Sequence, residues 1–445
     1  MRIINCTDPG QAERLLKRES STVRDVEEAV AGILADVRVR GDDALFEYAR
    51  RFDKAVLTGL IVEQDEIEAA AALVGPETMD CLRKAAQRIS DFHQQQVRQG
   101  FELQTAPGIQ LGQRVLPLDR VGVYIPGGTA SYPSTILMNV LPAKIAGVAE
   151  IIAATPPSPD GTVNPVILAA AAVAGVSRIF KMGGAQAVAA MTWGTQTVPR
   201  VDKITGPGNT YVATAKRMVF GEVGIDMIAG PSEILIIADA GANPDWIAAD
   251  LLSQAEHDAL ARAILVTDSS KLAQEVSVQI AERIKMLPRR EIAQKSLTDH
   301  GCIILTDRLQ TAVEIANVIA PEHLEIMTAE PFPLMEQIRH AGSVFLGSYT
   351  PEAAGDYLAG PNHTLPTGGT ARFSSPLSVD DFTKKMQYLC YDRSALIGDI
   401  PVISALARLE GLEGHARSAE SRLQEPEEAK ESGASGESEE SEESR

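Results

Sequence analysis

The chain is long, acidic and poor in aromatic residues. It has 445 residues, of which 44% are hydrophobic and 4% aromatic, and its formal net charge is −19. A chain of this length exceeds one ordinary domain, so we expect two or more packing units with cores built from Ala, Val, Ile and Leu. The acidic balance argues against a nucleic-acid-binding protein, which needs a basic face.

The first hundred residues have a mainly helical pattern. Apolar residues recur at helical spacing over 23–37, where Ser21 and Thr22 are placed to cap the helix. Gly41-Asp42 then ends this helix and begins another, which runs through Tyr48. The N-terminus has no apolar signal region.

The pattern changes at Arg120, where short apolar strands begin to alternate with alanine-rich helices such as 132–147 and 166–173. Continuous apolar strands separated by helices indicate parallel sheets covered on both faces, and therefore the α/β class. After Pro376 the pattern becomes helical again to about Arg422. The expected strands are Val121–Ile125, Ile151–Ala154, Ile179–Met182, Ile234–Ala238, Ala263–Thr267, Cys302–Leu305 and Val344–Leu346.

Three further features concern membrane association, the cellular compartment and the order of the C-terminal tail. The longest apolar run, 166–176, is too short to span a bilayer. The four cysteines show no paired spacing, which favours reduced thiols in a cytoplasmic protein. From Glu425 to Arg445 there are nine Glu against one Lys and one Arg, a net charge of −7, so we expect this tail to be disordered.

Three glycine-rich turns follow strands, at 125–128, 183–186 and 206–209. Glycine lets the backbone approach a phosphate, and the helix that follows presents free N–H groups. None of the turns matches G-x-G-x-x-G, so a nucleotide or anion site and a set of tight structural turns both remain open. Tyr124, at a strand end, could stack on a ring.

Gln254 and His257 stand three residues apart on an expected helix and therefore share a face. They would suit a metal that holds a substrate, since glutamine is a weak neutral ligand, but a solvated polar face is the simpler alternative. Ser232, in Gly230-Pro-Ser-Glu233, lacks the context of a nucleophile elbow, which favours a hydrogen-bonding role.

Four more candidates lie in polar segments bounded by glycine or proline. Glu322-His323 follows Pro321 and offers a general acid and base. Asp356 and His363 flank Gly360-Pro361, a loop of the kind that carries function. His415 by itself is compatible with an ordinary surface histidine. Together, Gln, Asp and two His would make a plausible nitrogen and oxygen shell for a divalent cation.

These segments resemble the histidinol dehydrogenase family over roughly residues 3–420. Many specific motifs occur in the right order, which makes accident improbable. The most specific matches are Val121–Gly128, Gly183–Ala187, Thr205–Asn209, Ala229–Glu233, Asp250–Asp258, Ala320–Glu325 and Gly355–Thr367.

The resemblance implies a homodimer whose subunit has two incomplete Rossmann-like domains with parallel sheets, plus small N-terminal and C-terminal helical domains. The C-terminal domain would reach into the partner's active site. The implied division is an N-terminal arm (1–23), a discontinuous core domain with the metal and catalytic residues (24–123 and 233–376), an NAD-binding domain (124–232), a C-terminal helical domain (377–424) and the acidic tail (425–445).

The resemblance also implies the roles of individual residues. Zinc, one ion per subunit, would bind Gln254, His257, Asp356 and His415, with His415 arriving from the second subunit. Glu322 and His323 would be the acid–base pair. The implied substrate contacts are Ser232, His363 and Glu410 beside the metal ligands and His323, and the implied NAD contacts are Tyr124, Gln186 and Asn209.

The implied reaction is the four-electron oxidation of L-histidinol to L-histidine with two NAD molecules, the last step of histidine biosynthesis. Three alternatives stay open: oxidation of another alcohol, such as a sulfonated diol, a zinc hydrolase without a nucleotide, and a zinc-dependent binding protein. His363 and Glu410 suit a cationic amino-imidazole and favour histidinol. The sequence predicts neither a nucleic-acid partner nor a membrane partner.

Overall fold

The computed structural model describes residues 1–6, 8–15, 24–127, 132–228 and 230–423. Ser21, Thr22, Gly128 and the predicted disordered tail lie outside these described residues. The chain divides into two compact units, one of Met1–Arg98 with Leu116–Lys384 and the other of Gln99–Val115 with the residues from Lys385 on.

The first unit contains a five-stranded sheet in the order β6-β5-β4-β7-β8, and all its pairings are parallel. The chain leaves β4 toward β5 on one side and returns to β7 on the other, which makes the end of β4 a topological switch point. The strands are β4 (Arg120–Tyr124), β5 (Glu150–Thr155), β6 (Arg178–Lys181), β7 (Lys203–Thr205) and β8 (Gly224–Ile225).

Both faces of this sheet are covered by helices. Successive strand residues Ile151 and Ile152 belong to different buried clusters, as the two-residue period of a strand requires. On one face pack α4 (Gln64–Gln94), α5 (Pro133–Ala146) and α6 (Pro165–Ala174). On the other pack α2 (Arg24–Arg40), α3 (Asp42–Tyr48), α7 (Gly184–Trp193) and α8 (Thr210–Val219).

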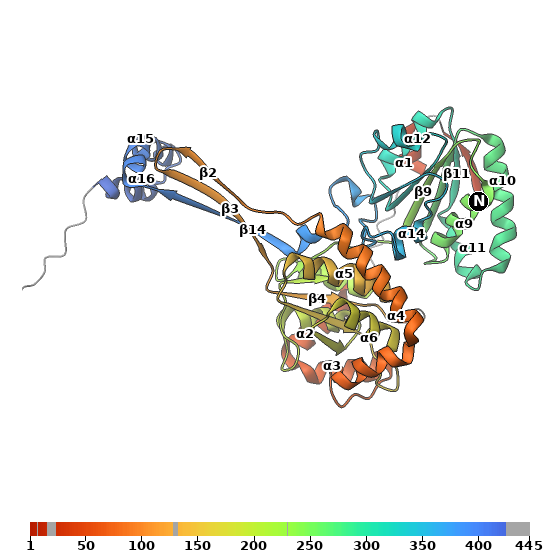
Figure 1. Cartoon of the computed structure of the whole chain (residues 1–445), viewed down its shortest axis with the longest axis horizontal. Coiled ribbons are helices and arrows are strands. Elements are labelled where there is room, and N and C mark those ends of the chain that lie inside the picture. Colours follow the sequence, from red (N-terminus) through yellow and green to blue (C-terminus); the bar gives the residue numbers. More distant parts are fainter. Residues whose placement is uncertain (7, 16–23, 128–131, 229, 424–445) are drawn as a thin grey trace, which may run out of the picture. The chain divides into compact units, whose positions relative to one another are not determined.

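The first unit also contains a six-stranded parallel sheet in the order β1-β11-β10-β9-β12-β13. Its strands are β1 (Arg2–Asn5), β9 (Glu233–Ala238), β10 (Arg262–Thr267), β11 (Cys302–Leu305), β12 (His323–Met327) and β13 (Ser343–Leu346). Figure 1 shows helices on both faces: α9 (Pro244–Ala255), α10 (Ser270–Arg283) and α11 (Arg290–Asp299) on one, and α1 (Pro9–Leu15) and α12 (Leu309–Ile319) on the other. The short helices α13 (Pro331–Met335) and α14 (Glu352–Tyr357) complete this part of the chain.

The second unit is built from strands as well as helices. Its antiparallel hairpin, β2 (Phe101–Ala106) and β3 (Ile109–Pro117), is joined by β14 (Thr383–Tyr391) in the order β14-β3-β2. The helices α15 (Arg393–Leu409) and α16 (Glu413–Glu420) pack on each other after β14. The predicted C-terminal helices are therefore present, and they follow a strand, β14, that pairs with a hairpin almost three hundred residues earlier in the chain.

The α/β fold with parallel sheets is confirmed, and each of the seven predicted strands is found to within a residue or two. The resemblance groups residues 24–123 with 233–376, and the packing is different. Gln99–Val115 belong to the second unit, and the helices α2, α3 and α4 pack on the helices of the five-stranded sheet. Their apolar faces fit the surface left open beside α5, α7 and α8, and a sequence pattern gives the apolar face of a helix without naming the sheet it meets.

Two properties of the described ranges concern the surroundings of the protein. Within them, no helix is both long enough and apolar enough to cross a bilayer. Cys6 and Cys302 are buried, Cys81 and Cys390 are exposed, and all four are free thiols.

Candidate active site

The acid–base candidates stand together at the start of β12. His323 Nδ1 lies 3.2 Å from the carbonyl oxygen of Glu233, so its N–H donates to that carbonyl in the neutral ring. The other ring nitrogen, Nε2, is buried and has no hydrogen-bond partner among the described residues. Nε2 is therefore the nitrogen left free to exchange a proton.

Three carboxyl groups surround the His323 ring. Its nitrogens lie 3.8 Å from Glu322, 3.5 Å from Glu352 and 3.8 Å from Asp356. Burial lowers the pKa of His323, but the three carboxylates outweigh burial and raise that pKa to about 10. The three carboxyl groups therefore stabilise the imidazolium form of the ring once it has taken up a proton.

Two of these carboxyl groups, Glu322 and Glu352, also have raised pKa values. Glu322 accepts a hydrogen bond from the backbone N–H of Glu233 at 2.9 Å, and burial raises its pKa to about 7. Burial likewise raises the pKa of Glu352 to about 8. A carboxyl group that exchanges its proton near neutral pH can serve as a general base or acid.

Sequence reasoning missed two acidic residues of this cluster, Glu352 and Glu325. Glu325 accepts a hydrogen bond from the Glu352 backbone N–H at 2.9 Å and so holds the start of α14. The spacing of these two residues from predicted site residues could have identified both. Glu352 stands four residues before Asp356 on one helix, and Glu325 stands two after His323 on one strand, so each shares a face with a predicted residue.

Three of the four predicted metal ligands, Gln254, His257 and Asp356, lie close to this cluster. Gln254 is buried on α9, and its side-chain amide donates to Glu352 Oε1 at 2.7 Å in the orientation that satisfies both groups. His257 follows this helix. Burial lowers the pKa of its ring, and the negative charge of nearby Asp356 opposes that effect. Asp356 stays ionised: burial raises its pKa, but its interaction with His323, whose Nε2 lies 3.8 Å away, outweighs burial and holds the pKa below its usual value.

These donors fit a divalent cation. Ligand atoms of His323, Glu352 and Asp356 all lie within 4.8 Å of one another. Asp356 belongs both to this set and to the predicted set with Gln254 and His257. A cation among nitrogen and oxygen donors of this kind would relieve the repulsion of the clustered carboxylates.

Of the predicted substrate contacts, His363 is close to this cluster. Its Nδ1 lies 3.0 Å from the backbone oxygen of Asp356, and burial lowers its pKa, so the ring is neutral and presents Nε2. Ser232 directly precedes β9. Glu410 and His415, at the end of α15 and on α16, are exposed residues of the second unit.

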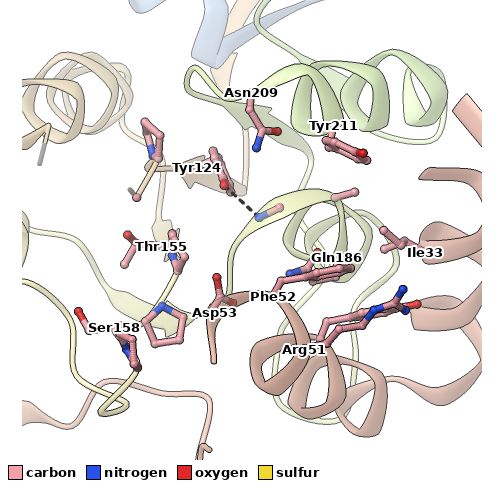
Figure 2. Close-up of a pocket in the computed structure, with 18 of the residues that line it drawn as sticks. Ile33, Arg51, Phe52, Asp53, Tyr124, Thr155, Ser158, Gln186, Asn209 and Tyr211 are labelled. Atoms are coloured by element: carbon pink, nitrogen blue, oxygen red, sulfur yellow. Dashed lines mark hydrogen bonds between the residues drawn. The ribbon is translucent and has the colours of Figure 1, made fainter. Parts of the chain in front are cut away.

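The three predicted NAD contacts line one cavity of about 1140 Å³ at the switch point of the five-stranded sheet. Tyr124 ends β4, and its hydroxyl accepts a hydrogen bond from the backbone N–H of Gly184 at 3.0 Å, at the start of α7 (Figure 2). Gln186 is on the first turn of α7. Asn209 caps α8 by accepting from the Val212 N–H at 3.1 Å, which leaves its side-chain NH₂ available.

The glycine turn before Asn209 is held by a buried ion pair. Gly206 has φ +108°, and a Cβ there would lie 2.1 Å from the Tyr124 carbonyl oxygen, so only glycine fits. Lys216 donates to the Gly206 carbonyl at 2.9 Å, while Asp226 accepts from the Gly206 N–H at 2.8 Å. The Lys216 and Asp226 side chains also pair with each other and are 3% and 1% exposed.

Comparison with known proteins gives matches along nearly the whole chain. The sequence model of the family described as histidinol dehydrogenase matches residues 16–423. A histidinol dehydrogenase of Halalkalibacterium halodurans is 54% identical over 396 residues, which cover 89% of this chain and 93% of that protein. One of Geobacter sulfurreducens is 54% identical over 402 residues, with 89% and 94% covered.

A solved structure agrees with the sequence matches. The crystal structure of histidinol dehydrogenase from Elizabethkingia anophelis superposes with a TM-score of 0.91 at 39% sequence identity, covering 95% of this chain and 98% of that one. The same family is thus found by its sequence model, by relatives above half identity and by fold. The chain belongs to the histidinol dehydrogenase family of oxidoreductases.

Proposed function

We propose that the protein is a cytoplasmic, zinc-containing enzyme that oxidises L-histidinol to L-histidine in two NAD-dependent steps, through histidinal. The observation that carries the proposal is the His323 ring, whose Nδ1–H donates to the Glu233 carbonyl and whose buried Nε2 has no hydrogen-bond partner within the described ranges. An imidazole oriented in this way is suited to take the proton of an alcohol.

In the first oxidation, His323 Nε2 takes the hydroxyl proton of histidinol while the carbinol carbon loses a hydride to NAD. The products are the aldehyde, NADH and a proton that the ring must release before the next step. Glu352 and Asp356, 3.5 and 3.8 Å from the ring nitrogens, stabilise the imidazolium formed in between.

In the second oxidation, the aldehyde adds water before another hydride can leave. Glu322 is placed to take a proton from this water, and His323 then takes a proton from the hydrate as the second hydride departs to a second NAD. Overall, one alcohol, two NAD and one water give one carboxylate, two NADH and three protons. Glu322 is competent when ionised, which its pKa of about 7 allows near neutral pH.

Zinc would be held by Gln254, His257, Asp356 and His415. When bound, it would coordinate the nitrogens of the substrate and so orient its carbinol carbon. Ser232, His363 and Glu410 would make further contacts to the substrate. Residues 124–232 would bind NAD through Tyr124, Gln186 and Asn209. Residues 233–376 would supply most of the acid–base and metal groups.

The decisive test is NADH absorbance on mixing the metal-loaded protein with NAD and histidinol. We expect two NADH per histidinol consumed, loss of activity after chelation, and its return with Zn or Mn. Full activity in protein shown by elemental analysis to lack metal would contradict the role of the cation. NADH formed from a sulfonated diol but not from histidinol would favour the alternative alcohol, and the absence of NADH with every alcohol would favour a hydrolase or a binding protein.

We also propose a homodimer in which Glu410 and His415 complete the partner's site. Two inactive variants, His257→Ala and His415→Ala, should then complement each other after dissociation and reassociation. In a heterodimer both lesions fall in one site and the other site is intact. Random mixing in a 1:2:1 ratio should therefore restore about a quarter of wild-type activity.

The control for this experiment is each variant taken alone through the same dissociation and reassociation, which should remain inactive. Subunit exchange is verified independently with a mass-tagged chain. If exchange occurs and no activity returns, His415 either acts within its own chain or does not bind the metal.

A further inference from the structure

The cavity lined by Tyr124, Gln186 and Asn209 is also lined by a carboxylate that has one oxygen without a hydrogen-bond donor in the described part of the chain. Asp53 lines this cavity, and its Oδ2 is buried with no hydrogen-bond donor among the described residues. Burial raises the pKa of Asp53 to about 6. A buried carboxylate oxygen without a donor costs free energy, so a hydroxyl brought by a ligand would stabilise the complex.

The second carboxylate of the cavity, Asp36, gives the contrast. Arg40 donates to it through Nε and Nη2, both at 2.6 Å, and the Tyr48 hydroxyl donates at 2.8 Å. These bonds hold the pKa of Asp36 below its usual value. Asp36 is therefore satisfied within the protein, whereas no donor among the described residues reaches Oδ2 of Asp53.

The backbone fixes the position of Asp53. It ends a π-helical turn, η1 (Ala49–Asp53), and Lys54 follows in the left-handed conformation with φ +61°. A non-glycine residue in this conformation is uncommon and is retained where the surroundings determine it. The fully buried Ala55 supplies that constraint, since its N–H donates to the Ala49 carbonyl at 3.1 Å.

The neighbours of Asp53 suit a nucleoside. Phe52 of the same turn lines the cavity although it is 48% exposed, and Ile33 of α2 adds apolar surface to that wall (Figure 2). The apolar surface of Phe52 and Ile33 could contact a purine ring while Asp53 accepts hydrogen bonds from the attached ribose. Arg51 also lines this side of the cavity, and the Cζ atom of its guanidinium group lies 5.1 Å from the centroid of the Phe52 ring.

We propose that Asp53 accepts hydrogen bonds from the adenosine ribose hydroxyls of NAD and so makes the protein prefer NAD to NADP. An acidic residue that binds the ribose diol is a general means of recognising NAD, and a 2′-phosphate would bring negative charge against the same carboxylate. The inference rests on the proposed NAD-dependent function and deepens it, because it assigns the residue that selects the cofactor.

The test uses the metal-loaded, full-length protein and measures binding directly by the fluorescence of NADH and NADPH and by calorimetry with NAD and 2′-deoxy-NAD (at the adenosine ribose). Asp53→Ala should weaken NAD binding by about 10- to 100-fold, the range for a hydrogen bond to a charged group. It should raise KM for NAD with little change in kcat. Asp53→Asn, of the same shape, should improve NADPH binding relative to NADH.

The matched control is Ser158→Ala, which removes a polar side chain from the same cavity and should leave the NADH-to-NADPH ratio unchanged. In the wild type, loss of the 2′-hydroxyl should weaken binding, though by less than Asp53→Ala does because the 3′-hydroxyl remains, and in Asp53→Ala it should add little more. A full additional loss in that variant, with a normal melting temperature, would overturn the assignment. A wild-type protein that binds no dinucleotide would overturn the proposed function and this inference with it.

Discussion

Replacing His323 with Asn is expected to lower kcat by about 10²- to 10⁴-fold for both histidinol and histidinal, the usual contribution of a general base. Asparagine cannot take a proton at the position of Nε2, and both oxidations need that proton removed. Single-turnover NADH yields from each substrate measure the two steps separately. Retained turnover of either substrate would show that another group removes its proton.

Glu322→Gln gives the matched comparison, because glutamine keeps the size of the side chain and loses the charge. It should spare alcohol oxidation and impair aldehyde oxidation, which depends on hydration. In the wild type the aldehyde step should speed up as the pH rises through about 7, where Glu322 loses its proton, and the variant should lack this rise. Equal losses on the two substrates would remove the role assigned to Glu322.

Breaking the buried pair of Lys216 and Asp226 is the change expected to cost most stability. Asp226→Ala leaves a buried ammonium group without a counter-charge and frees the Gly206 N–H, so it should reduce the free energy of unfolding by about 3–5 kcal/mol. Replacing both residues with apolar ones, Lys216→Met with Asp226→Leu, should cost less than the single change. Urea titration followed by circular dichroism measures the differences.

An exposed pair provides the control for that cycle. Arg83 and Asp80 lie on α4 with side chains 62% and 76% exposed, and removal of either should cost at most about 1 kcal/mol. The Asp226 variant should also bind NADH more weakly, since its partner Gly206 opens the turn that ends at Asn209. A double variant less stable than Asp226→Ala alone would contradict the argument from desolvation.

Much of the first unit could be predicted because its signals are local. The strands Ile234–Ala238 and Ala263–Thr267 are continuous apolar runs, and such runs predict buried parallel strands wherever they occur. Glu322-His323 and Asp356 stood out because polar residues between glycine and proline are unusual in an apolar sequence. The structure brings these three residues together around one ring.

What could not be predicted depends on contacts between distant segments. Nothing near Asp53 in the sequence marks it as part of the cavity, because most of the residues that line the cavity lie beyond residue 120. The sequence of 101–117 alone does not show that its hairpin pairs with β14, which lies far along the chain. Glu352 and Glu325 share a face with predicted residues, but only the structure shows that Glu352 lies 3.5 Å from the His323 ring and that its backbone N–H donates to Glu325.

The three-stranded sheet of the second unit has a consequence for engineering and for evolution. Because β14 pairs with β3, this unit is assembled from an internal insertion and the end of the chain, and neither piece holds a complete sheet. Truncation before β14 would leave the β2–β3 hairpin exposed along one edge, a known risk for aggregation. A family member could therefore gain, lose or exchange this unit only by changing two separate stretches of its gene together.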